Sequence, residues 1–225
     1  MTEIRAGQQA LQTPRAAGLA GVVFALLLAA AMVLIRLSIP QGAESDTLQG
    51  LTDPTRRSAV KAALALVPLA GICFLWFMGA LRARMGEAED QFLATVFLGS
   101  GLVFVATLFG VAAAAAGVLA TTDAPGGTPG LPAWNFGRHL AYTLLTEYAT
   151  RMAAVFTCST SVICHRLRLL PRWLSLLGFL TFLTLLFVSA GVPWSELVFP
   201  AWSLLVGAFV FAAGRSPRPG TAAAS

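Results

Sequence analysis

Six long apolar runs take up most of this sequence and constrain its fold more than any other feature. A helix crosses a hydrocarbon core of about 30 Å with about 20 apolar residues, and each run is close to that length or longer. Only 11% of the 225 residues are charged, against about 25% in soluble domains. We therefore expect an all-α polytopic membrane protein, a bundle of six transmembrane helices with no separate soluble domain. The expected spans are 16–39, 58–81, 91–120, 139–164, 172–190 and 194–213.

The first run is longer than the roughly 7 to 15 apolar residues of a secretory signal peptide. It lacks a convincing small-residue cleavage site, so we expect a membrane helix; cleavage is the alternative. Arg36 lies near its end, where its side chain can reach the membrane interface. Pro68 and Pro200 are expected to bend the second and sixth spans.

The connections between the runs are short. Segment 124–132 is rich in Gly and Pro and predicts a loop, and Trp134 and Phe136 after it suit a membrane interface. The acidic stretch 86–90 favours a helix start at residue 91. Segment 191–193 predicts a tight turn, so that the last two spans form an antiparallel hairpin.

Basic residues predict the orientation, because they collect on the cytoplasmic side of membrane helices. Nine lie on the side of the termini and five on the other side. We therefore expect tails 1–15 and 214–225 to be cytoplasmic and the protein to lie in the bacterial inner membrane. The net charge of +5 is then mostly a matter of orientation, and no nucleic-acid partner is expected. The nine are Arg5, Arg15, Arg82, Arg84, Arg166, Arg168, Arg172, Arg215 and Arg218. Arg166, Arg168 and Arg172 can also contact anionic lipid.

Segment 139–164 alone carries charged chemistry near the middle of a span. Glu147 and Arg151 are one helical turn apart, with the acid first, which is the favourable order for an ion pair. A helical projection puts them in a polar stripe that we expect to face the bundle interior, leaving Leu145, Met152, Phe156 and Ile163 for lipid or apolar neighbours. The candidate polar site comprises Glu147, Arg151, Thr143, Thr150, Cys158 and Ser161.

Two interpretations of this stripe stay open. In the functional one, Glu147 accepts a proton or cation, Arg151 holds an anionic group, and the hydroxyls complete the site. In the structural one, the two charges neutralise each other and the hydroxyls bond backbone carbonyls. His139 and His165 flank opposite ends of this span and cannot share a metal ion.

Segment 91–120 carries small residues at steps of three, four and seven, a spacing that lets membrane helices approach closely. It predicts a helix-packing seam, with a flexible hinge as the alternative. The seam comprises Gly99, Ala106, Gly110, Ala113 and Gly117. Cys73, Cys158 and Cys164 show neither disulfide nor metal-ligand spacing. No phosphate-binding loop, paired-His metal motif or nucleophile elbow is present, so we expect no catalytic residue, metal or cofactor.

Several short motifs carry a resemblance. Segments 74–77, 86–101, 151–156 and 170–174 resemble an uncharacterised family of small bacterial six-helix integral membrane proteins, with a broader similarity to DUF4386-type membrane proteins. The resemblance covers the second to sixth spans. It implies an inner-membrane protein and transfers no catalytic role.

The function expected from these features is a small transporter or permease-like protein with a polar site in segment 139–164. The alternative is a non-catalytic membrane subunit or scaffold that packs against another copy or another membrane protein. A lipid-acting enzyme using Glu87, Glu89 and Asp90 is a third reading. The lipid bilayer is a partner in each case.

Overall fold

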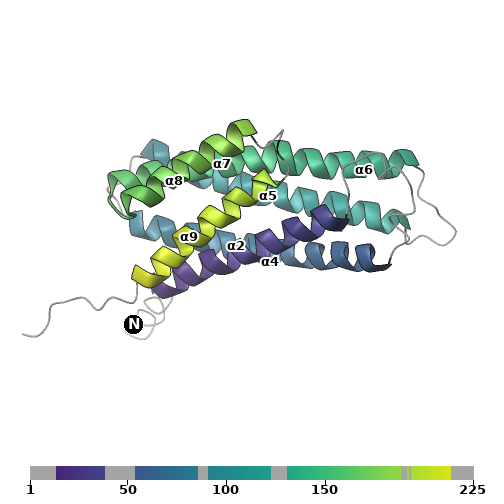
Figure 1. The fold of residues 1–225 in the computed structure, drawn as a ribbon, viewed down its shortest axis with the longest axis horizontal. Coiled ribbons are helices and arrows are strands. Elements are labelled where there is room, and N and C mark those ends of the chain that lie inside the picture. Colours follow the sequence, from purple (N-terminus) through teal and green to yellow (C-terminus); the bar gives the residue numbers. More distant parts are fainter. Residues whose placement is uncertain are drawn as a thin grey trace, which may run out of the picture.

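The computed structural model describes residues 14–38, 54–85, 91–122, 131–188, 192 and 194–213, and these are helical apart from short connections (Figure 1). Its elements are α2 (Pro14–Ser38), α4 (Pro54–Met85), α5 (Gln91–Thr122), α6 (Leu131–Thr143), η2 (Leu144–Ala149), α7 (Thr150–Arg166), α8 (Arg172–Leu183), η3 (Thr184–Val188), η4 (Ser195–Leu197) and α9 (Val198–Ala213). Of these, η2 and η3 are π-helical and η4 is a 3₁₀ turn.

Four helices are long and apolar enough to cross a membrane: Gly18–Leu37, Pro54–Met85, Gln91–Ala120 and Ser195–Ala213. Arg172–Phe187 is a shorter apolar helix. The expectation of a helical protein is confirmed for the described residues, and four of its helices have the length and apolar composition of membrane spans. The membrane bundle and the number of crossings remain predictions.

The largest difference from the expected boundaries concerns segment 139–164. Here α6, η2 and α7 follow one another without a break, so this helix begins at Leu131, inside the segment expected to be a loop. Pro132 is accommodated because the first turn of a helix needs no backbone N–H from it. Trp134 and Phe136 are helical residues as well. The acidic stretch 86–90 and most of the 189–193 turn lie outside the described residues.

The helices form two closely packed groups. In one, α2 packs extensively against α4 and α9; in the other, α7 packs against both α5 and α8. Packing of α4 on α5 joins the two groups. The long helices α4, α5 and α6 extend beyond the ends of α2 and α9 (Figure 1). A small second core lies where that extension begins, formed by Ile35, Val60, Ala63 and Leu119.

Phenylalanine rings join the two groups at the centre of the bundle. The Phe74 ring on α4 lies 4.7 Å from the Phe24 ring on α2 and 4.9 Å from the Phe156 ring on α7, centroid to centroid. Phe104 on α5 and Phe199 on α9 close the cluster at 5.1 Å. All five side chains are buried. Phe156, Leu145 and Ile163 were expected to meet lipid or apolar neighbours, and all three are buried among apolar neighbours inside the bundle.

A close helix crossing lies between α2 and α9. A Cβ on Gly207 would lie 2.8 Å from the backbone nitrogen of Val22, and Gly18 and Gly21 face the same crossing. Only glycine permits this approach.

The small-residue seam expected on α5 does not pack within the described residues. Gly99, Ala106, Ala113 and Gly117 are exposed, and no atom lies within 4 Å of a Cβ placed on Gly99 or Gly117. Gly110 alone approaches a neighbour, Leu144, at 3.5 Å. The close approach within the described residues uses the glycines of α2 and α9, and the small residues of α5 form an outer face. Packing of this seam against another copy or another membrane protein stays a prediction.

Candidate functional site

A buried ion pair joins the first and last described helical segments. Arg36, near the end of α2, donates two hydrogen bonds from Nη2 to the Glu196 carboxylate, 2.7 Å to Oε1 and 2.9 Å to Oε2. The Arg36 side chain is 13% exposed and the Glu196 side chain 4%. Arg36 had been expected to reach the membrane interface. The structure instead buries it against Glu196.

The backbone at the start of α9 brings Glu196 to this position. Trp194 has a φ of 71° in the left-handed region, which a bulky residue adopts at an energetic cost. Its ring lies under the Arg36 guanidinium, 5.5 Å from centroid to Cζ, within the range of a cation–π contact. Arg36 therefore contacts two residues of the same short segment, Trp194 through its ring and Glu196 through its carboxylate.

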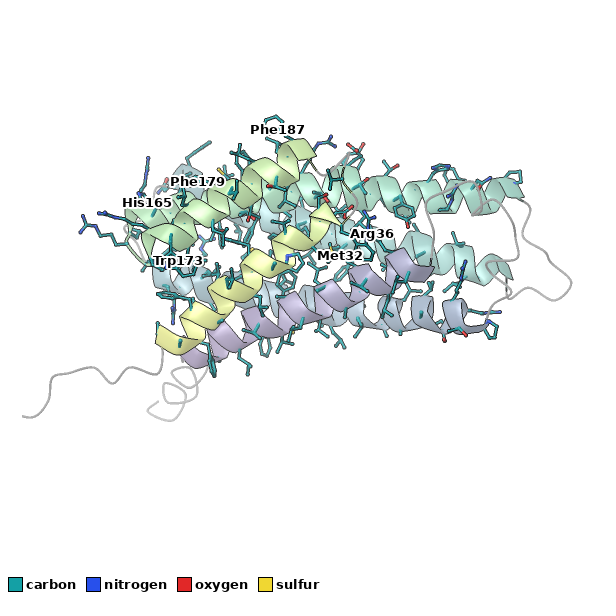
Figure 2. The ribbon with its side chains drawn as sticks, in the orientation of Figure 1. Met32, Arg36, His165, Trp173, Phe179 and Phe187 are labelled. Atoms are coloured by element: carbon teal, nitrogen blue, oxygen red, sulfur yellow. The ribbon has the colours of Figure 1, made fainter. Side chains whose placement is uncertain are left out.

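A small, mostly apolar cavity lies beside Glu196, where the two helix groups meet. Its volume is about 10 Å³, and its lining includes Met32 and Phe199 from one group and Thr150, Ala153 and Leu185 from the other. A cavity of that volume is about the smallest that can hold one water molecule. Figure 2 shows Arg36 and Met32 on α2 near the start of α9, far from His165 and Trp173 at the α7–α8 end.

A second cavity of about 10 Å³ lies nearer α6, and most of its lining is apolar. Arg138 and Tyr142 line it together with Ile35, which directly precedes Arg36. The candidate site is therefore Arg36 and Glu196, with Thr150 and Tyr142 around them.

The charged pair expected in segment 139–164 is present, but it lies elsewhere. Arg151 donates from Nη1 to Glu147 Oε2 and to the Glu147 backbone carbonyl. The Glu147 and Arg151 side chains are 36% and 47% exposed, so the expectation that they face the bundle interior is wrong. They lie on the outer surface of the bundle.

The uncharged polar side chains of the expected stripe fall into a buried set and a more exposed set. Thr150, Thr157 and Ser161 are buried, whereas Thr143 is exposed and Cys158 is half-buried. Each buried hydroxyl donates to a backbone carbonyl earlier in the same continuous helix. Thr150 donates to Leu145 at 2.8 Å, Thr157 to Ala153 at 2.8 Å and Ser161 to Thr157 at 2.7 Å. Thr150 is the member of the stripe that reaches the candidate site.

The π-helical segment explains why the projection failed. A π segment adds a residue to the helical turn, and the Thr150 hydroxyl bonds the carbonyl five residues back. Residues before η2 are therefore rotated relative to those after it, and a uniform 100° step places Glu147 on the wrong face. Arg151 and Cys158 lie at the edge of the stripe.

The remaining candidate groups stay apart. His139 and His165 are exposed on α6 and α7, and Cys73, Cys158 and Cys164 are free thiols. No three His, Cys, Asp or Glu side chains of the described residues are grouped so that they can hold a metal ion.

The Arg36–Glu196 pair was missed because its partners are 160 residues apart in the chain. The available signal was the presence of one basic and one acidic residue near the outer ends of the first and last spans.

Comparison with known proteins identifies no relative: no family model, no curated protein and no solved structure matches this chain.

Proposed function

We propose that this chain is a bacterial inner-membrane protein with six helical crossings and cytoplasmic termini. The motif resemblance and the basic residues at one end support this. Arg82 and Arg84 end α4, Arg166 ends α7, Arg168 lies in the following turn, and Arg172 begins α8. Positive charge at one end of the bundle is the usual mark of its cytoplasmic side.

Within that membrane protein, we propose a small transporter of protons or small cations, and Glu196 is its binding group. The observation that carries this proposal is the burial of the Arg36–Glu196 pair beside a small cavity between helices, lined by Glu196 and Thr150 among apolar side chains. Ionisable groups buried in membrane helices usually serve ion or proton pathways. Glu147 and Glu196 are the carboxylates among the described residues, and only Glu196 is buried.

The position of the cavity suits such a role. At about 1.5 Å per residue, the helical stretches from Gly18 to Met32, from Ala213 to Phe199 and from Arg166 to Thr150 each measure roughly 21 to 24 Å. With the cytoplasmic interface at the α7–α8 end, the cavity lies in the outer half of a hydrocarbon core of about 30 Å. A proton or cation arriving from outside would meet Glu196 before crossing the phenylalanine cluster.

Arg36 acts in this proposal as an internal counter-charge. Proton or cation binding at Glu196 weakens its two hydrogen bonds to Arg36 and frees η4 from the end of α2. The two helix groups are then free to move apart at Thr150. The volume of about 10 Å³ corresponds to the closed state.

The test is proton flux in vesicles that contain a pH-sensitive dye, with valinomycin and potassium to balance charge. We expect vesicles with the protein to lose a pH gradient faster than empty vesicles, and Glu196→Gln to return the rate to that of empty vesicles. Glu147→Gln is the matched control, because it makes the same change in the exposed pair, and it should retain the flux. Equal rates for Glu196→Gln and the unaltered protein, or no flux above empty vesicles, would overturn the proposal.

A second candidate is a non-catalytic subunit or scaffold, favoured by the exposed small-residue face of α5. Gly110→Leu or Ala113→Leu should then separate a complex that co-purifies with the unaltered protein. A stable monomer that purifies alone argues against this function.

A further inference from the structure

A groove of about 420 Å³ lies between the end of α4 and the start of α5, away from the Arg36–Glu196 site. Its rim carries Arg82, Gln91 and Thr95, and its floor is apolar, with Leu98, Gly99 and Leu102. The volume falls in the usual range for small-ligand sites, about 300 to 1,000 Å³. A phospholipid would match this groove, with its charged head group at the polar end and an acyl chain along the apolar surface.

The rim presents a cation and a free amide to an anionic group. Arg82 is exposed and makes no ion pair among the described residues, and Gln91 is exposed beside it. The Thr95 hydroxyl donates to the Gln91 backbone carbonyl at 2.8 Å, so the Gln91 side-chain amide is the second polar group that lines the groove and is available to a ligand. An arginine guanidinium matches the geometry of phosphate oxygens.

The floor has the length of a lipid chain within one leaflet. From Gln91 to Leu102, α5 rises roughly 16 Å, and one leaflet contributes about half of a hydrocarbon core of about 30 Å. Gly99 keeps the groove open, since no atom lies within 4 Å of a Cβ placed there. A bulkier residue would fill the middle of the floor.

We propose that this groove binds one anionic phospholipid of the cytoplasmic leaflet, with the phosphate at Arg82 and an acyl chain along Leu98, Gly99 and Leu102. The proposal rests on the membrane placement proposed above and is independent of transport. A basic residue near an anionic membrane surface contributes about 1 kcal/mol to lipid attraction, which is a change in affinity of about fivefold.

The test is native mass spectrometry of the delipidated protein in detergent, titrated with phosphatidylglycerol or phosphatidylcholine of identical chains. We expect the unaltered protein to prefer phosphatidylglycerol, and Arg82→Gln to weaken that binding about fivefold. Lys61→Gln is the matched control: it removes one exposed positive charge from the other end of α4 and should change nothing. Gly99→Leu should weaken the binding of both lipids, because it obstructs the chain and not the phosphate.

Two further outcomes decide the identity of the ligand. Excess glycerol 3-phosphate should fail to displace the lipid, since the acyl chain supplies much of the binding; displacement would indicate a site for a free phosphate compound and overturn the proposal. A photoreactive phosphatidylglycerol should label peptides of α4 and α5. Equal binding by Arg82→Gln and the unaltered protein, or an equal loss in Lys61→Gln, would also overturn it.

Discussion

Arg36 and Glu196 are joined by two hydrogen bonds of 2.7 and 2.9 Å although they are 160 residues apart in the chain. The pair ties the end of α2 to the start of α9, and the Trp194 ring lies against the same guanidinium. Glu196 is the only acidic residue among the described residues of α2, α4, η4 and α9, so the charge of Arg36 depends on Glu196 for neutralisation.

Removing one partner of this pair should be costly. Glu196→Gln leaves Arg36 buried without a counter-charge, and we expect the free energy of unfolding to fall by about 3 kcal/mol. Glu147→Gln, in the exposed pair, should cost less than about 1 kcal/mol. Unfolding in mixed detergent micelles measures both values. A similar cost for the two variants would contradict the difference in burial.

Replacing both charges should cost less than the sum of the single replacements. Arg36→Met and Glu196→Met each strand a charge, whereas the double variant leaves two apolar side chains. A double-mutant cycle on the same unfolding measurement gives the interaction energy, which we expect to be about 2 kcal/mol. Strict additivity would show that the two side chains do not interact.

The α2–α9 crossing predicts a contrast between glycines. Gly207→Ala places a Cβ 2.8 Å from the Val22 nitrogen, so we expect a loss of about 1 to 3 kcal/mol of stability through overpacking. Gly117→Ala meets open space and should leave stability unchanged or slightly raised, because alanine favours the helix. Thermal unfolding in detergent compares the two, and equal midpoints would argue against the close crossing.

The phenylalanine cluster predicts a second contrast. Phe156 is fully buried and Phe187 is 74% exposed. Phe156→Ala should lower the free energy of unfolding by about 3 to 5 kcal/mol because it leaves a cavity between the helix groups. Phe187→Ala removes the same atoms from the outer surface, where lipid replaces them, and should cost far less. A larger loss in Phe187→Ala would contradict the arrangement of the rings.

The sequence was informative about the helices and less so about their faces. Hydropathy alone predicted the long apolar segments, because each helix satisfies its backbone internally and its length follows from membrane thickness. Spacing alone predicted the Glu147–Arg151 pair, because partners four residues apart are neighbours on any helix. The start of α6 at Leu131 was missed because Gly and Pro upstream suggested a longer loop.

Which faces pack together depends on contacts between distant segments. The projection of segment 139–164 assumed a uniform helix, and the π-helical turn at Leu144–Ala149 changes the phase of everything before it. Small residues on α5 had the right spacing for packing, yet the glycines of α2 and α9 make the close crossing. Spacing shows what a face permits, and only the tertiary arrangement decides which face is used.

The most direct test of the proposed closed site is the accessibility of Thr150, which lines the cavity beside Glu196. In a background without native Cys residues, Thr150→Cys should resist a membrane-impermeant thiol reagent in oriented vesicles. With Glu196→Gln added, the same probe should react from the side opposite the termini, because the contact that closes the cavity is weakened. A probe that stays unreactive in both folded proteins would mean that Arg36 and Glu196 form a dry structural pair, and the proposed transport site would be wrong.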